Sequence, residues 1–119
     1  PSRMKIAEDR VGDVTILRLS GRFELEEGDL IFRDRVNTLV AAGRVKIVLD
    51  FKNVSRIDSA GIGMLVSKYL TARKRGGTIK LLNLTRHSDH LIDITRLDTV
   101  FEIFDDEGAA VKSFDGAPS

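Results

Sequence analysis

The spacing of apolar and polar residues predicts two strands at the start of the chain. Residues 4–9 alternate apolar and charged side chains, and residues 14–20 do so less strictly. Gly12 and Asp13 lie between them and favour a tight turn, so the two segments are predicted to form an antiparallel hairpin. Residues 21–28, with three glutamates, are expected to form a loop.

The next apolar residues follow the spacing of a helix. Phe32, Val36, Leu39 and Val40 recur at intervals of three and four, which places them on one face. Gly43 follows directly after them and is a typical helix stop. This segment is therefore predicted to be an amphipathic helix.

Two short apolar runs predict buried strands further along the chain. VKIVLDF at 45–51 and TIKLLNL at 78–84 are nearly continuous, as expected for strands covered on both faces. Between them we expect a loop at 52–58 and a helix that begins near Ser59. Basic residues and then glycines, RKRGG at 73–77, favour the end of that helix.

The remaining elements complete an alternating order of strands and helices. A polar helix is expected at about 87–95, a strand at 100–104 and a short helix at 106–114, opened by Asp105. Strand–helix–strand units imply parallel pairing with right-handed crossovers, so the two apolar runs should lie adjacent and parallel. The predicted fold class is α/β (α+β), with a four- to five-stranded mixed sheet packed with about four helices.

Composition limits the classes of function. The chain has 119 residues, enough to bury a core, and it has no cysteine for a disulfide or a thiolate metal site. Its 19 basic and 18 acidic residues give a net charge of +1, which does not favour nucleic acid as a partner. With no long apolar run or signal segment, we expect no membrane insertion and a cytoplasmic location. We expect one domain over 1–119, with a loose tail at about 115–119.

Ser59 is the main candidate for a functional residue. Serine is a preferred helix N-cap, so a purely structural role is possible. Gly61 and Gly63 follow it, although each glycine costs a helix about 0.5–1 kcal/mol relative to alanine. Their missing side chains would leave the Ser59 hydroxyl accessible at the positive end of a helix, a suitable place for a phosphate.

Motifs for catalysis or nucleotide binding are incomplete around Ser59. AGIG at 60–63 lacks the third glycine of a dinucleotide-binding loop, and no G-K-[ST] follows it. A G-x-S-x-G nucleophile elbow would need glycine at Ile57. We therefore expect no catalysis by Ser59, and we do not expect the chain to be an enzyme.

A second cluster, RHSDHLID at 86–93, raises the possibility of a metal site. His87, His90 and Asp93 would share one face of a helix, but their spacing matches no strong metal-binding signature. The alternative is the solvated face of an amphipathic helix. That helix would bury its apolar residues: Leu91, Ile94 and Leu97. We expect no metal and no cofactor here.

One long segment resembles a known family. VKIVLDFKNVSRIDSAGIGMLVSKYLTARKRGGTIKLLNL, at 45–84, resembles the STAS family, the domain of bacterial anti-sigma factor antagonists. The similarity is strongest in the D-S-x-G turn at Asp58–Gly61 and in the paired glycines before the second apolar run. Gly21 and RLDTVFEIFDDEGAAVKSF, at 96–114, also match in register. The resemblance implies a single domain with a β core and four helices.

The resemblance also implies a regulatory mechanism. Ser59 would be phosphorylated by an anti-sigma factor that is a protein-serine kinase with a histidine-kinase-like ATPase fold. The unphosphorylated chain would bind this partner and release the sigma factor, and a serine phosphatase could act in the same system. The expected partner-binding residues surround the serine: Glu24, Ser55, Arg56, Asp58, Ser59, Ala60, Gly61 and Gly63.

A different function remains open for the same domain. STAS domains also serve as regulatory subunits of ABC-type lipid or ion transport systems, where binding matters and phosphorylation does not. The intact serine at position 59 favours the antagonist. A kinase gene or a permease gene next to the coding sequence would distinguish the two.

Overall fold

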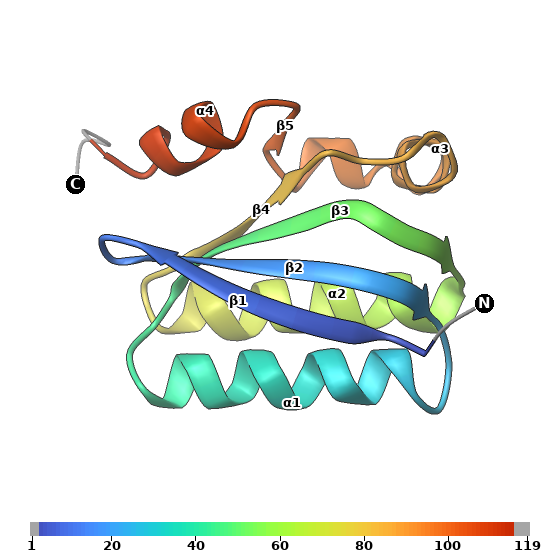
Figure 1. Cartoon of the computed structure of the whole chain (residues 1–119), viewed down its shortest axis with the longest axis horizontal. Coiled ribbons are helices and arrows are strands. Elements are labelled where there is room, and N and C mark those ends of the chain that lie inside the picture. Colours follow the sequence, from blue (N-terminus) through green and yellow to red (C-terminus); the bar gives the residue numbers. More distant parts are fainter. Residues whose placement is uncertain (1–2, 116–119) are drawn as a thin grey trace.

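A computed structural model describes residues 3–115, which contain one five-stranded sheet with helices on both of its faces (Figure 1). The strands lie side by side in chain order. They are β1 (Lys5–Val11), β2 (Val14–Phe23), β3 (Lys46–Ile57), β4 (Thr78–Leu82) and β5 (Ile103–Phe104). The expected tail lies outside the described residues from 116 onward.

The pairing of the strands confirms the predicted topology. β1 and β2 form the antiparallel hairpin, and the other neighbouring pairs are parallel. The two apolar runs form β3 and β4, which are adjacent and parallel. The predicted mixed sheet is therefore correct.

Four α-helices cover the sheet, as predicted. α1 (Gly28–Ala41) and α2 (Ser59–Lys74) pack side by side on one face. α4 (Glu107–Lys112) covers part of the other face, and α3 (Arg86–Ile94) contacts β3 and lies near its carboxyl end (Figure 1). A short 3-10 helix, Leu97–Thr99, follows α3.

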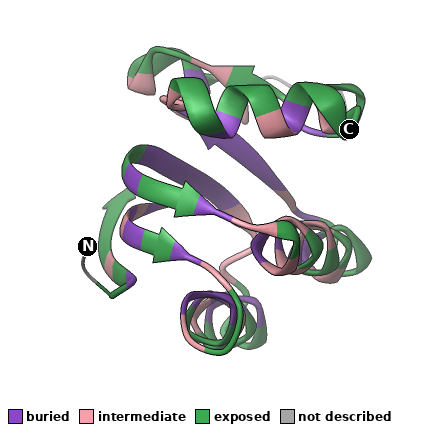
Figure 2. Cartoon of the chain, turned by 90° about the vertical axis from the view of Figure 1, so that its right-hand side faces the viewer, coloured by how far each residue is buried: buried purple, intermediate pink, exposed green. Residues whose placement is uncertain are grey.

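The main core lies between the sheet and the pair α1 and α2. Phe23 packs against Phe32, with ring centroids 4.9 Å apart, and stacks on Phe51 at 6.4 Å. All four apolar residues predicted to share one face of α1 are buried. Figure 2 shows buried residues along the strands and exposed residues on the outer turns of the helices.

A smaller core lies on the opposite face, under α4. Its fully buried or nearly buried members are Val14, Ile16, Val48, Leu82 and Ala110. Lys80 of β4 is only 5% exposed beside them. Its ammonium donates to Ser113 Oγ at 2.8 Å and lies 4.2 Å from the centre of the Phe114 ring, which holds the end of α4 against the sheet.

β2 and β3 are both longer than the sequence indicated. The predicted loops at 21–28 and 52–58 were wrong in part, because Gly21–Phe23 continue β2 and residues 52–57 continue β3. The two extensions pair with each other across irregularities in the register. These irregularities interrupt the apolar alternation from which strands are predicted.

The predicted boundaries near the C-terminus also needed correction. β4 ends at Leu82, before residue 84, and β5 is limited to Ile103–Phe104 instead of 100–104. The cap of α4 is Asp106 and not Asp105, because the Asp106 carboxylate accepts the Ala109 N–H at 2.8 Å.

α3 buries a different residue from the one expected. Ile92 is buried, Leu91 and Leu97 are half-buried, and Ile94 is 58% exposed. Among the described helices, none is both long enough and apolar enough to cross a membrane.

Candidate functional site

A single residue, Asp58, connects β3 to α2. Its backbone is extended, and its Oδ1 accepts a hydrogen bond from the Gly61 N–H at 2.9 Å. This contact satisfies one of the N–H groups that a helix leaves free at its start. The helix cap is therefore Asp58, so the structural explanation of Ser59 as the cap is wrong.

The second carboxylate oxygen of Asp58 reaches a different segment. Its Oδ2 accepts a hydrogen bond from the Leu25 N–H at 3.1 Å. Leu25 belongs to the connection between β2 and α1, so one side chain holds that connection next to the start of α2. The two carboxylate oxygens of Asp58 thus hold the start of α2 and the connection between β2 and α1 in place.

Gly61 allows α2 to begin directly against the end of β2. A Cβ atom at position 61 would lie 2.3 Å from the Phe23 carbonyl oxygen and 2.8 Å from Ile57 Cγ1. No real side chain fits at such distances. The glycine is required for packing, in addition to any role near the serine.

Gly63 has a different environment from Gly61. It is exposed, and a Cβ added there would meet no atom within 4 Å. Residues four apart on a helix share a face, so Gly63 lies one turn beyond Ser59 on the same side. The surface next to the Ser59 side chain is therefore bare backbone.

Ser59 is the first residue of α2, and it is exposed. Within residues 3–115, its hydroxyl makes no hydrogen bond with the protein and has no histidine or free carboxylate bonded to it. Nothing there would activate the hydroxyl as a nucleophile. Such a residue is suited to be modified by another protein.

A charged rim borders the start of α2. Glu24 Oε2 lies 3.3 Å from Arg56 Nε, and Glu24 Oε1 lies 3.9 Å from Arg22 Nε. The structure thus brings two predicted residues, Glu24 and Arg56, together beside the cap. Ser55 is exposed on β3 and forms no hydrogen bond with this group in the described chain.

Leu25 was missed when the sequence was considered alone. It is 62% exposed, although it is a large apolar side chain, and its backbone is bonded to the helix cap. The signal was present as one leucine between the acidic residues of FELEEGD. Its exposed side chain lies on a segment that is hydrogen-bonded to Asp58, the residue before Ser59.

The histidines of α3 take positions that do not form a metal cluster. The Nε2 atom of His87 lies 3.3 Å from the Ile57 carbonyl oxygen, at the end of β3. Over the described residues, no group of three or more His, Cys, Asp or Glu side chains is arranged to hold a metal ion.

The fold and this turn define a recognised class of domain. A family model described as "Mlab, STAS domain" matches residues 6–104, and the chain therefore belongs to the STAS domain family. The match includes the cap, the serine and both glycines.

Known proteins with related sequences and structures support this result. The anti-sigma F factor antagonist of Paenibacillus polymyxa is 27% identical over 94 residues, which cover 79% of this chain and 80% of that protein. The crystal structure of protein TM1081 of Thermotoga maritima has a TM-score of 0.85 at 25% identity, and the match covers 91% of this chain and 92% of that one.

A third relative has been solved in two chemical states. The Bacillus protein SpoIIAA in its phosphorylated form has a TM-score of 0.73 at 19% identity, with 92% of this chain and 99% of that chain covered. Its unphosphorylated form has a TM-score of 0.71, also at 19% identity, with 95% and 100% covered. At this identity the likeness shows the fold.

Proposed function

We propose that this protein is an anti-sigma factor antagonist regulated by phosphorylation of Ser59. The observation that carries the proposal is the position of Ser59: its hydroxyl is exposed and unbonded at the start of α2, beside a cap formed by Asp58. The protein would act in the cytoplasm by binding a partner, and it would not itself catalyse the transfer of phosphate to Ser59.

The proposed partner is an anti-sigma factor that is also a protein-serine kinase with a histidine-kinase-like ATPase fold. The unphosphorylated protein binds this partner, and the sigma factor is released. The kinase site of the partner transfers phosphate to Ser59, and a serine phosphatase reverses the change. Relatives named as antagonists of anti-sigma factors support this assignment.

Phosphorylation would change binding more than it changes the fold. A phosphoserine carries about −1.5 to −2 charges at neutral pH. The helix N-terminus stabilises a negative charge by about 0.3–1 kcal/mol, which offsets repulsion from Asp58. A dianion buried against a partner without matching cations costs several kcal/mol, so we expect a loss of affinity of about 10³-fold or more.

The proposed contact surface extends from Ser59 over the neighbouring residues. Ala60 and Gly63 continue it along α2, and Leu25 supplies an apolar contact. Asp58 and Gly61 would contribute by holding the turn in place. The charged side of the surface consists of Glu24, Ser55 and Arg56.

Variants of Ser59 test the proposal. Ser59→Ala should bind the anti-sigma factor constitutively, and Ser59→Asp should bind about 10³-fold more weakly, because its charge mimics part of the phosphate. Both should stay folded. Calorimetry measures the affinity of each variant for the candidate kinase, the one encoded next to this protein. Phosphosite mapping after incubation with that kinase and ATP shows which residue is modified.

Ser67 provides a matched control on the same helix. It is also an exposed serine of α2, two turns further along. Ser67→Ala and Ser67→Asp should leave binding and phosphorylation unchanged. Phosphate on another residue, or tight binding by Ser59→Asp, would refute the proposed switch; tight binding of a transporter ATPase instead would support the transport alternative.

A further inference from the structure

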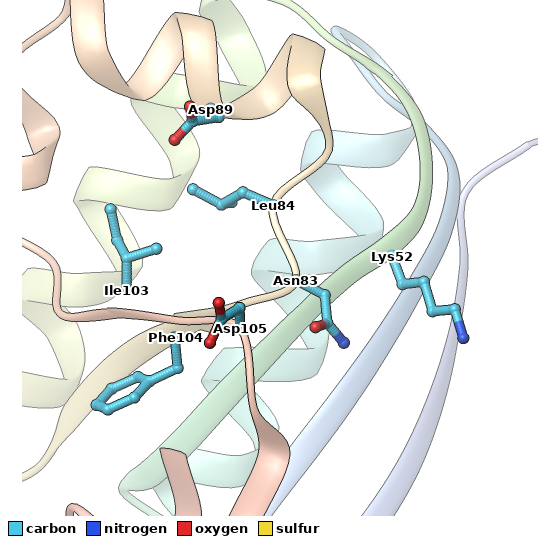
Figure 3. Close-up of a pocket in the computed structure, with 7 residues that line it drawn as sticks. All are labelled: Lys52, Asn83, Leu84, Asp89, Ile103, Phe104 and Asp105. Atoms are coloured by element: carbon cyan, nitrogen blue, oxygen red, sulfur yellow. The ribbon is translucent and has the colours of Figure 1, made fainter. Parts of the chain in front are cut away.

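A crevice that includes none of the residues around Ser59 borders α3. It lies past the carboxyl ends of β4 and β5, beneath α3, and has a volume of about 590 Å³ (Figure 3). In open sheets of parallel strands, ligands commonly bind outside the carboxyl ends of the strands. Its lining residues are Lys52, Asn83, Leu84, Asp89, Ile103, Phe104 and Asp105.

The walls of the crevice are held by hydrogen bonds. The Asn83 N–H donates to the Phe104 carbonyl oxygen at 2.9 Å, which joins the ends of β4 and β5. The Asn83 side-chain amide donates to Asp50 Oδ1 at 3.2 Å, which joins the same point to β3. The crevice is therefore formed before any ligand arrives. Binding of a ligand would require little ordering of the protein.

The crevice combines apolar side chains with two unpaired carboxylates and one lysine. Leu84 and Ile103 border it, and Ile103 is a large apolar side chain left 38% exposed. In the part of the chain that the structure describes, the carboxylates of Asp89 and Asp105 have neither an ion pair nor a hydrogen bond. Lys52 extends away from both carboxylates (Figure 3).

Some acidic residues elsewhere are paired, whereas others, such as Glu26, Asp93 and Asp98, also lack an ion pair among the described residues. Asp9, Asp50 and Glu107 all contact Arg18, and these carboxylates raise the pKa of that guanidinium. Asp13 is likewise paired with Lys46 at 2.6 Å. The crevice thus has two exposed carboxylates that form no ion pair within the described residues, although the Lys52 side chain also borders it.

We propose that this crevice is a second docking site, which receives an arginine or lysine side chain from a partner protein together with an adjacent apolar residue. The cation would lie between Asp89 and Asp105, and the apolar neighbour would contact Leu84 and Ile103. Charge complementarity selects a basic segment as the occupant.

A titration followed by nuclear magnetic resonance tests the inference on the full chain. The probe is the capped peptide acetyl-Leu-Arg-Leu-amide, and its uncharged counterpart has glutamine in place of arginine. The arginine peptide should shift the amide signals of Asn83, Leu84, Asp89, Ile103 and Asp105. Because two exposed ion pairs are lost, the double variant Asp89→Asn, Asp105→Asn should bind it about tenfold more weakly.

Matched controls make each result decisive. Asp93→Asn removes an exposed carboxylate from the same helix but outside the crevice, and it should leave the affinity unchanged. Equal binding of the glutamine peptide, full affinity in the double variant, or no shift at all would overturn the proposal. Agmatine binding as tightly as the peptide would also overturn it, because the site would then serve a free amine.

Discussion

The cluster beneath α1 and α2 contains 19 of the buried apolar residues described, whereas the cluster beneath α4 contains five. The first includes three contacting phenylalanines and two long helices. The second is closed by a helix of six residues. We infer that the first face provides most of the stability, since buried apolar area is the main favourable term in folding.

Each face also contains one buried lysine, and the two lysines have different polar contacts. Lys68 of α2 is 8% exposed and donates to the neutral Asn37 Oδ1 at 2.7 Å. Lys80 of β4 lies 3.0 Å from Glu102 Oε2 and also donates to Ser113. On the small face, polar contacts of a lysine supplement the apolar core; on the large face, a buried cation lacks an ion pair among the described residues.

The two proposed sites differ in the elements and the apolar cores that support them. Ser59 is on a 16-residue helix anchored in the large core, while the crevice is bordered by α3, by Leu84, which packs on the large core, and by the two-residue β5, whose Phe104 packs on the small core. We therefore expect the surface near Ser59 to keep its shape under perturbations that loosen the crevice. Four predictions concern these features, and the first and the third compare the two faces directly.

The largest expected effect comes from truncating one leucine on each face. Leu49 and Leu82 are both fully buried, in the large and the small core respectively. Leucine-to-alanine changes in cores cost about 2–5 kcal/mol, depending on how far the site can collapse. We expect the loss of stability for Leu49→Ala to lie near the upper end of this range. The loss for Leu82→Ala should lie near the lower end, because α4 can move inward and fill part of the cavity. Urea unfolding measures both, and equal losses would contradict the comparison.

A second prediction uses the two glycines of α2. Gly61→Ala should destabilise the fold by about 1–3 kcal/mol, because its Cβ would overlap the Phe23 carbonyl. Gly63→Ala should instead stabilise it by about 0.5–1 kcal/mol, since its Cβ meets open space and alanine favours a helix. Thermal unfolding distinguishes them. The prediction fails if the two changes have the same sign.

A third prediction concerns the cap. Asp58→Ala should cost about 0.5–2 kcal/mol, the usual value for a lost N-cap. The Leu25 N–H should also lose its partner and exchange its hydrogen faster with solvent. Asp106→Ala, at the cap of α4, is the control on the small face. It should affect exchange in α4 but leave Leu25 protected.

The smallest effect should come from Lys68. Burial, with a contribution from Arg33, lowers the pKa of Lys68. As the pH rises towards the ordinary lysine pKa of about 10.4, the folded state loses this proton before the unfolded state does, so stability rises in that window. Lys68→Met should lack this increase. Urea unfolding of both proteins at pH 7 and at the upper end of the window measures it; parallel pH profiles would count against it.

The strands and helices could be predicted where apolar periodicity was regular. The run at 45–51 and the face of α1 were confirmed because burial on a sheet or against a helix produces those repeats directly. The end of β3 was missed because its buried residues Phe51, Val54 and Ile57 are three apart. That spacing follows from irregular pairing with β2, whose paired residues, such as Gly21 with Val54, are 33 positions earlier in the chain.

The sequence predicted where the turn between β3 and α2 lies, but not which residue caps α2. Aspartate and serine are both good caps, so the sequence alone could not say which of Asp58 and Ser59 would cap α2. In the structure Asp58 is the cap, because its Oδ1 accepts from the Gly61 N–H, and its Oδ2 accepts from the Leu25 N–H, a contact between distant segments. The crevice was not foreseen, because its walls come from β3, the connection between β4 and α3, α3 itself and β5, and no local motif marks their meeting point.

The single-residue connection between β3 and α2 determines what a modifying enzyme would have to recognise. Ser59 has no flexible tether, and drawing it into an extended form would break both hydrogen bonds of Asp58. The recognised object would therefore be a folded corner and not a linear motif. A synthetic peptide with the sequence of residues 53–70 would contain every residue from Asp58 to Gly63. We nevertheless expect it to be a poor substrate for the modifying enzyme.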